Sequence, residues 1–121
     1  MSGGAEISLD EARQKVRTLL DAAEKSMAQF GWGLRSEAEQ AEHEKHCRLA
    51  ITQVEHHDFG WLFYYNSAVF VETGEIGHLL AGNGPYLVER ETGRVFETGT
   101  AYPVDHYLEL HCRGGLPRVE R

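Results

Sequence analysis

The sequence predicts an α+β domain in which an N-terminal helix packs on an antiparallel sheet of about four strands and a short C-terminal helix closes the fold. Three observations support this class: a capped amphipathic segment near the N-terminus, β-prone runs separated by turn residues after position 48, and a short apolar segment that begins at Pro103. The 121 residues fit one domain. We therefore expect a single unit over residues 1–121, with loose ends at 1–7 and 114–121.

The first helix has the clearest start signal. Ser8-Leu9-Asp10-Glu11 is a capping box, in which the Ser8 and Glu11 side chains each accept a hydrogen bond from the other residue's backbone N–H. Apolar residues then recur at helical spacing, at Leu9, Ala12, Val16, Leu19, Leu20, Ala23 and Met27. Gly31 and Gly33 are expected to end this helix, because glycine lowers helix stability.

The polar segment that follows, residues 35–45, predicts either a second short helix or a solvated loop, and its pattern does not decide between them. Four carboxylates crowd it, at Glu37, Glu39, Glu42 and Glu44. Such a run is either a solvated face or an acidic patch that steers a basic partner into place. Trp32 lies beside it, as an aromatic anchor for that partner or as a core residue at the end of the first helix.

The middle of the chain predicts β-strands. Residues 48–55 are β-prone, residues 56–60 form the expected hairpin loop, and residues 61–65 are apolar on both faces, which is typical of a central strand covered on both sides. Residues 67–72 are expected either to continue that strand or to form a separate short one.

Turn residues separate the remaining elements, at Thr73-Gly74, Gly82-Asn83-Gly84-Pro85 and Gly114-Gly115. Residues 86–89 and 94–97 flank a further turn and predict a hairpin. Pro103 opens the short last helix, at a position where its missing N–H costs little.

Composition limits the classes of partner. The net charge of −7 repels phosphate backbones and anionic lipids, so nucleic acid and membrane are poor candidates and a basic protein is a better one. The longest apolar run, residues 61–65, is too short to span a bilayer, and the first residues carry no signal-peptide pattern. We expect a cytoplasmic protein whose two cysteines stay reduced.

Candidate chemistry is weak. His43, His46 and Cys47 are close enough in sequence to suggest a metal site, and Cys47 or Cys112 could pair with a histidine as a nucleophile, but neither set has the spacing of a known motif. There is no phosphate-binding glycine loop and no GxSxG turn. We expect a protein that is not an enzyme and that has no cofactor or metal.

From Gly60 to Leu110, about half of the chain, the order of short motifs resembles the immunity protein 35 domain family. The motifs are Gly60-Trp61-Leu62-Phe63-Tyr64-Tyr65-Asn66-Ser67, Glu72-Thr73-Gly74, Leu80-Ala81-Gly82-Asn83-Gly84-Pro85, Glu91-Thr92-Gly93 and Thr98-Gly99-Thr100-Ala101-Tyr102-Pro103. The resemblance implies a bacterial protein of polymorphic toxin systems that binds and neutralises a cognate toxin. Chaperone-like holding of unfolded chains, also associated with this group, is the alternative.

The resemblance brings no catalytic residues. Its matched positions are expected to make the fold, with turns at Gly82, Gly84 and Gly93, element starts at Pro85 and Pro103, and core side chains at Trp61 and Tyr64. The structural positions of the motif are Trp61, Tyr64, Asn66, Thr73, Gly74, Gly82, Asn83, Gly84, Pro85, Gly93, Gly99 and Pro103. The acidic segment lies outside the matched stretch, where a partner-specific surface is expected.

Overall fold

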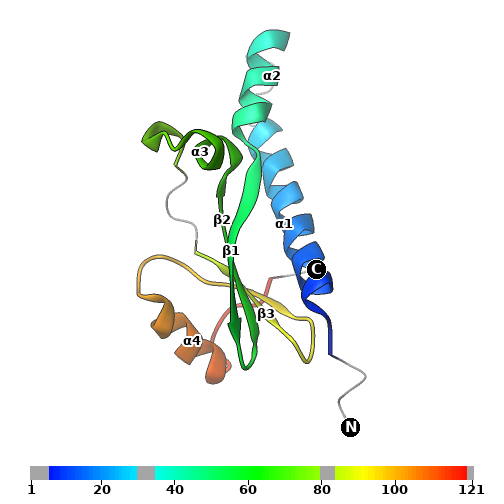
Figure 1. The fold of residues 1–121 in the computed structure, drawn as a ribbon, viewed down its shortest axis with the longest axis vertical. Coiled ribbons are helices and arrows are strands. Elements are labelled where there is room, and N and C mark those ends of the chain that lie inside the picture. The colour runs from blue at the N-terminus through cyan, green and yellow to red at the C-terminus, as the bar shows by residue number, and fades with distance from the viewer. Residues whose placement is uncertain (1–5, 30–34, 80–83, 120–121) are drawn as a thin grey trace.

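The computed structural model describes residues 6–29, 35–79 and 84–119 and contains the expected α+β arrangement (Figure 1). Four antiparallel strands form one sheet in the order β1-β2-β3-β4, so each strand pairs with its neighbour in sequence. The elements are α1 (Leu9–Gln29), α2 (Glu37–His46), β1 (Leu49–His57), β2 (Gly60–Ser67), α3 (Ala68–Thr73), η2 (Ile76–His78), β3 (Tyr86–Glu89), β4 (Val95–Glu97) and α4 (Val104–Cys112).

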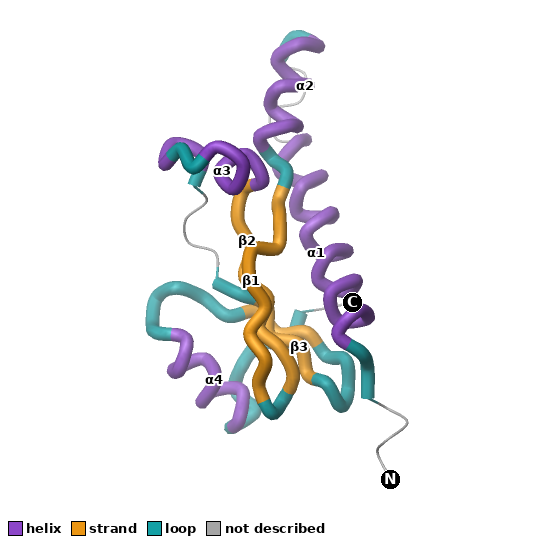
Figure 2. Tube along the Cα trace, viewed as in Figure 1, coloured by secondary structure: helices purple, strands orange, loops and turns teal. Residues whose placement is uncertain are grey.

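Helix α1 covers one face of the sheet (Figure 2). The capping box forms as expected, with Ser8 N–H donating to Glu11 Oε1 at 2.8 Å and Glu11 N–H donating to Ser8 Oγ at 3.1 Å. The apolar stripe of α1 packs against side chains from all four strands, and the buried members of this core are Ala12, Val16, Leu19, Leu20, Leu49, Trp61, Phe63, Tyr86, Val88 and Val95. Burial of this stripe supplies most of the stabilisation of the helix.

Helix α4 covers part of the opposite face. Leu62 and Leu87 are fully buried there, and side chains from α4 pack on them. Strand β2 therefore sends Trp61 and Phe63 to the α1 face and Leu62 to the α4 face, because successive strand residues point to opposite sides. The expectation of a central strand covered on both faces is confirmed.

The β1–β2 hairpin is tighter than the expected loop over residues 56–60. Strand β1 runs to His57 and β2 restarts at Gly60, which leaves two turn residues. Gly60 has φ +150°, and a Cβ built there would lie 2.0 Å from the carbonyl oxygen of Val88 on β3. Only glycine fits this close approach of two strands. A register shift between Ile51 and Gln53 marks an irregularity in β1.

Residues 67–72 are not a strand, contrary to expectation. Ser67 ends β2 and caps α3, since its Oγ accepts a hydrogen bond from the N–H of Phe70 at 3.3 Å. Gly74 ends the helix in the left-handed conformation, with φ 72°, and its N–H donates to the carbonyl oxygen of Phe70 at 2.7 Å. Caps at both ends outweigh the β propensity of the valines between them.

The polar segment after position 35 is a helix, so the first of its two expected alternatives is correct. Ser36 and Glu39 form a second capping box, with hydrogen bonds of 2.9 and 3.2 Å. The buried side chain of Gln40 donates to the carbonyl oxygen of Ala28 at 2.7 Å, and so pairs a carbonyl at the end of α1 that the helix itself leaves free. The two helices therefore hold each other by polar contacts.

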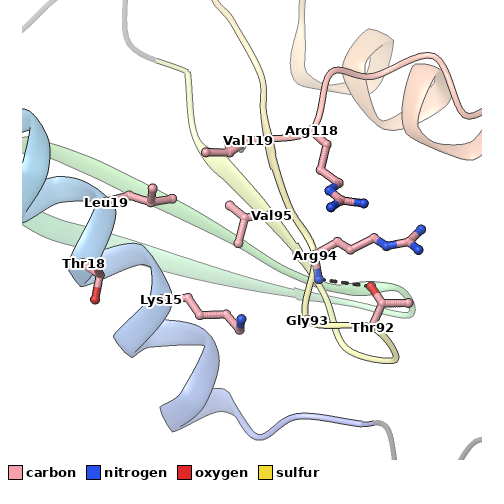
Figure 3. Close-up of a pocket in the computed structure, with 9 residues that line it drawn as sticks. All are labelled: Lys15, Thr18, Leu19, Thr92, Gly93, Arg94, Val95, Arg118 and Val119. Carbon is pink, nitrogen blue, oxygen red and sulfur yellow. Dashed lines mark hydrogen bonds between the residues drawn. The ribbon is translucent and has the colours of Figure 1, made fainter. Parts of the chain in front are cut away.

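The expected loose ends are partly wrong. Leu116 is buried on the α4 face, Arg118 forms an antiparallel bridge with Phe96, and the Val119 N–H donates to the carbonyl oxygen of Val95 at 2.8 Å. The C-terminal segment thus lies beside β4 and covers its outer edge (Figure 3). At the other end, the Ile7 N–H donates to the carbonyl oxygen of Arg90 at 2.9 Å.

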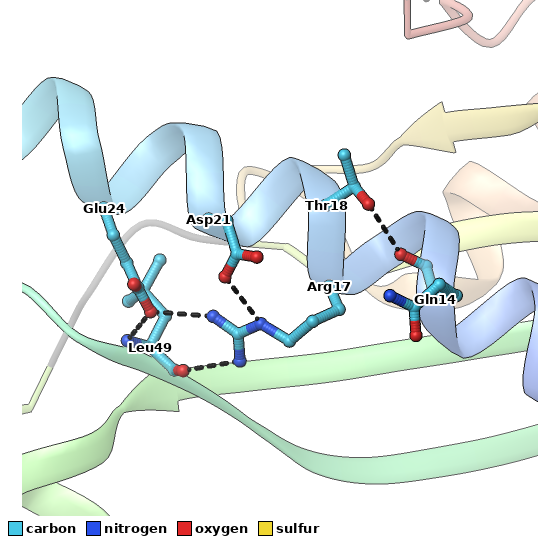
Figure 4. Close-up of polar contacts among 6 residues, drawn as sticks. All are labelled: Gln14, Arg17, Thr18, Asp21, Glu24 and Leu49. Atoms are coloured by element: carbon cyan, nitrogen blue, oxygen red, sulfur yellow. Dashed lines mark hydrogen bonds and ion pairs between the residues drawn. The ribbon is translucent and has the colours of Figure 1, made fainter.

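A polar clamp ties α1 to the start of β1 (Figure 4). The Arg17 guanidinium donates to the Leu49 carbonyl oxygen at 2.8 Å, to Glu24 at 2.7 Å and to Asp21 at 2.9 Å. Glu24 also accepts the Leu49 N–H at 2.7 Å. Both backbone polar groups of Leu49 that face away from β2 are satisfied in this way.

Candidate partner-binding surface

The four carboxylates expected to form one acidic patch lie on α2 and are exposed. They do not form one patch. Glu37 and Glu44 are seven residues apart and share a face, whereas Glu39 and Glu42 lie on another, because each residue turns the helix by about 100°. Between these pairs Gln40 is directed at α1.

The carboxylates also differ in their bonds. Hydrogen bonds from the backbone and hydroxyl of Ser36 lower the pKa of Glu39, which therefore serves the helix cap. Glu42 lies 3.6 Å from the His46 ring, and Glu44 accepts a long hydrogen bond from Gln40 at 3.4 Å. Trp32, the expected aromatic anchor, lies outside the described residues.

A second feature was missed by the sequence analysis. Among the described residues, Val71 on α3, Ile76 on η2 and Leu79 just after η2 are large apolar side chains with exposed fractions of 53%, 75% and 44%. We call these three residues the apolar cluster. Glu72 and Glu75 alternate with them in the same segment and are exposed. Apolar and acidic side chains therefore alternate along this exposed segment, and both kinds of side chain occur in protein interfaces, where an apolar core meets a polar rim.

The apolar cluster and the α2 carboxylates share one end of the molecule. Helices α2 and α3 both lie at the end opposite to α4 (Figure 1) and pack against one another. The only sequence signal for this surface is the presence of Val71, Ile76 and Leu79 in a segment otherwise rich in turn and charged residues. That signal becomes interpretable only once α3 is known to be a helix.

Several structural positions of the motif are buried or form hydrogen bonds within the fold. Trp61 is buried under α1, with the Arg90 guanidinium 5.0 Å from its ring, and Tyr64 is half-buried on the opposite face. Asn66 accepts the N–H of Ser67 at 2.8 Å. Thr73 donates its hydroxyl to the Val69 carbonyl oxygen at 2.8 Å and so helps Gly74 to end α3.

Several of the remaining motif positions bring the segment before β3 into close contact with the segment between β4 and α4. Gly84 lacks a positive φ, and the residues before it in the expected turn lie outside the described residues. A Cβ there would lie 2.6 Å from the backbone of Gly99, and a Cβ at Gly99 would lie 2.8 Å from the Tyr107 hydroxyl. Pro85 accepts two hydrogen bonds from Thr98. Two further positions act as expected, since Gly93 has φ 76° in a turn and Pro103 precedes α4, while Gly82 and Asn83 lie outside the described residues.

The histidines and cysteines considered for chemistry have structural contacts. His43 Nε2 lies 2.9 Å from the carbonyl oxygen of Met27, so its ring caps α1, and it also lies 3.5 Å from Cys47 Sγ. Burial raises the pKa of Cys47, which disfavours the thiolate needed for nucleophilic attack. Cys112 is exposed. Within residues 6–29, 35–79 and 84–119, no three His, Cys, Asp or Glu side chains gather closely enough to hold a metal.

A histidine of α4 connects that helix to β3. His111 Nε2 lies 2.7 Å from Glu89 Oε2, and the ring contacts Phe59 and Phe96 at centroid distances of 5.3 and 5.0 Å. Burial alone would raise the pKa of Glu89, but hydrogen bonds from Thr92 and His111 lower it overall. This contact stabilises the packing of α4 against β3.

The described part of the chain is an α+β domain whose end at α2 and α3 carries exposed acidic and apolar side chains. The family model named immunity protein 35 matches residues 10–110, and the chain belongs to this family. The chain is similar to the uncharacterized protein YrhB of Escherichia coli strain K12, with 38% identity over 50 residues, which are 41% of this chain and 53% of that protein. The match thus spans about half the length of that relative. No solved structure matches the chain. None of the helices in the described ranges has the length and apolar character that a membrane span requires.

Proposed function

We propose that this protein is a cytoplasmic bacterial immunity protein that binds and neutralises a cognate toxin by direct protein–protein contact, without catalysis, metal or cofactor. The observation that carries the proposal is the family match over residues 10–110. The family is one of immunity proteins, and we infer that this member acts by occupying a surface of its toxin. Nucleic acid and membrane are not proposed as partners, because the net charge of −7 opposes both.

The contact is proposed to centre on the apolar cluster of Val71, Ile76 and Leu79. Removal of these side chains from water supplies affinity, at roughly 25 cal/mol for each Å² of apolar surface buried. The carboxylates of Glu37 and Glu42, on two faces of α2, are proposed to attract a basic toxin surface over long range, which chiefly accelerates association. The complementary toxin surface is then an apolar recess bordered by lysine or arginine.

The proposal is tested by tagging the protein in its native bacterium and recovering bound proteins at moderate salt. One dominant partner, recovered in equal amount and encoded by an adjacent gene, supports the proposal. The triple variant Val71→Ser, Ile76→Ser, Leu79→Ser should lose that partner and should no longer protect cells that express it. Tyr102→Ser is the matched control, because Tyr102 is also apolar and 57% exposed but lies next to α4.

The charge contribution needs separate variants. Glu37→Lys with Glu42→Lys should slow association several-fold at low salt and less at high salt, because exposed charges are screened over about 10 Å at 0.1 M salt. Glu39 is left unchanged, since its loss would also remove the helix cap. Association rates that are equal to those of the unaltered protein at every salt concentration would remove α2 from the proposed interface.

A holdase that binds unfolded chains is the second candidate, and the exposure of the apolar cluster favours it. The two functions differ in their clients. Recovery of many unrelated proteins, together with suppression of aggregation of an unrelated test protein, would select the holdase. Both activities would depend on Val71, Ile76 and Leu79, so the identity of the bound proteins decides between them.

A further inference from the structure

A cleft of about 320 Å³ lies between α1, the turn before β4 and the C-terminal segment (Figure 3). Three cationic side chains border it, one from each of these parts of the chain: Lys15, Arg94 and Arg118. Leu19, Val95 and Val119 also line it and contribute aliphatic surface. The molecule as a whole carries a net charge of −7, so this grouping of positive charge runs against its overall character.

The cations of the cleft are available to a ligand. Neither Lys15 nor Arg118 has an ion-pair partner within the part of the chain that the structure describes. The positive charge of Arg94 is partly balanced by the nearby carboxylate of Glu89. Glu89 is itself committed to His111 and Thr92. In Figure 3 the guanidinium groups of Arg94 and Arg118 lie near one another on the same side of β4.

The turn that carries Arg94 is also built to keep the cleft open beside Lys15. Gly93 has φ 76°, and a Cβ there would lie 3.3 Å from Cε of Lys15. A side chain at this position would press on the lysine stem. The Thr92 hydroxyl accepts the backbone N–H of Arg94 at 3.1 Å and fixes the turn.

We propose that this cleft binds a short acidic segment of a partner protein, with carboxylates on the cations and a neighbouring apolar side chain on Leu19, Val95 and Val119. Arginine suits carboxylate because it can donate two parallel hydrogen bonds. Screening limits the repulsion from the rest of the acidic molecule, so an anion in the cleft meets chiefly the local positive field. A free polyphosphate is a poorer occupant than an acidic segment, since it has no apolar group to place on Leu19, Val95 and Val119.

This inference rests on the proposed function, because it gives the toxin a second contact of opposite charge on another part of the immunity protein. A partner that is basic opposite α2 and acidic opposite the cleft would dock in one orientation only. Such alternation of charge contributes specificity more than affinity.

The test uses isotope-labelled full-length protein and nuclear magnetic resonance titrations at low salt. The probe is the peptide acetyl-Glu-Leu-Glu-Leu-amide, the neutral control is acetyl-Gln-Leu-Gln-Leu-amide, and inorganic pyrophosphate is the third arm. We expect saturable shifts of the amides of Lys15, Gly93, Arg94 and Val119 with the acidic peptide, and binding at least five-fold weaker with the neutral peptide.

Variants complete the test. Lys15→Met with Arg118→Gln should weaken binding of the acidic peptide by about two-fold to twenty-five-fold, because each exposed ion pair contributes a factor of roughly 1.5 to 5. Arg113→Gln is the control, since that guanidinium is exposed and pairs with Glu109 at 3.2 Å on α4. Circular dichroism and melting temperature check that the variants fold.

Two results would overturn the inference: no saturable shift with the acidic peptide at 10 mM, or tighter binding of pyrophosphate than of the peptide at the same residues. The proposed function is judged separately by recovery of a toxin. If no toxin is recovered but the peptide binds, the acidic-segment site stands and the immunity function does not. If a toxin is recovered but the cleft variants bind it normally and the peptide fails, only the inference on the cleft is lost.

Discussion

Replacement of Arg17 by methionine tests how the first helix is held to the sheet. Methionine retains most of the aliphatic length of the side chain but removes its three hydrogen bonds, which reach Asp21, Glu24 and the carbonyl oxygen of Leu49. The Leu49 carbonyl oxygen is left without its outer partner in a partly buried position. Glu24 keeps the Leu49 N–H but loses its counter-charge.

The size of the effect follows from burial. A hydrogen bond to a charged group is worth about 1.5–3 kcal/mol when buried, whereas an exposed ion pair is worth about 0.2–1 kcal/mol. The side chains of Arg17 and Glu24 are 32% and 24% exposed, so the clamp lies between these limits. We expect Arg17→Met to lower the free energy of unfolding by about 2 kcal/mol, or the melting temperature by about 8 °C for a domain of this size.

Urea denaturation followed by circular dichroism provides the measurement. Arg113→Met is the control, because its ion pair with Glu109 is 69% and 66% exposed and its loss should cost less than about 0.5 kcal/mol. A double-mutant cycle with Glu24→Gln should show a coupling of about 1 kcal/mol. A loss of less than about 0.5 kcal/mol for Arg17→Met, equal to that of the control, would refute the argument that this clamp anchors α1.

Three further outcomes follow from particular residues. Gly60→Ala should lower the free energy of unfolding by about 3 kcal/mol or prevent folding, because the added Cβ would lie 2.0 Å from the Val88 carbonyl oxygen. Gly114→Ala is its control in the same denaturation assay. At Gly114 the added Cβ has open space and only the positive φ of 77° opposes it, so the loss should be about 1 kcal/mol. Hydrogen bonds make the pKa of Glu89 lower in the fold than its ordinary value of 4.5, so its contribution to stability is present above about pH 4.5 and is lost as the pH falls through the folded pKa. The stability difference between the unaltered protein and Glu89→Gln should therefore shrink as the pH falls below about 4.5, and a difference that instead grows there contradicts this sign. Iodoacetamide should label Cys112 much faster than Cys47, because Cys47 is buried and its pKa is raised, and mass spectrometry that finds equal rates would show that α2 opens readily.

The elements that could be predicted are those whose signals are local. The Ser8 capping box and the apolar spacing after it locate α1, and the doubly apolar run after Gly60 identifies the central strand. Helix α3 was not predicted, because six residues are too short to show a helical period and its valines favour strand. Its caps at Ser67 and Gly74 were visible in the sequence but also fit a strand that ends at a turn.

The surface was less predictable than the fold. The charges on α2 are plain in the sequence, but their division between two faces appears only once the helix is known and Gln40 is seen to face α1. The exposure of Ile76 depends on η2 and could not be inferred from its apolar character, which by itself favours burial. The cleft joins residues about a hundred positions apart, so no sequence pattern marks it.

The position of the C-terminal segment determines what the sheet can and cannot do. The bridge at Arg118 and the Val119 hydrogen bond occupy the outer edge of β4, while the clamp at Leu49 and the irregularity after Ile51 interrupt the outer edge of β1. Neither border offers a long uninterrupted ladder for a foreign strand. A partner is therefore expected to contact side chains on the helices and in the clefts rather than a sheet edge. A shortened chain that ends at Gly114 would expose the edge of β4, on which aggregation could start.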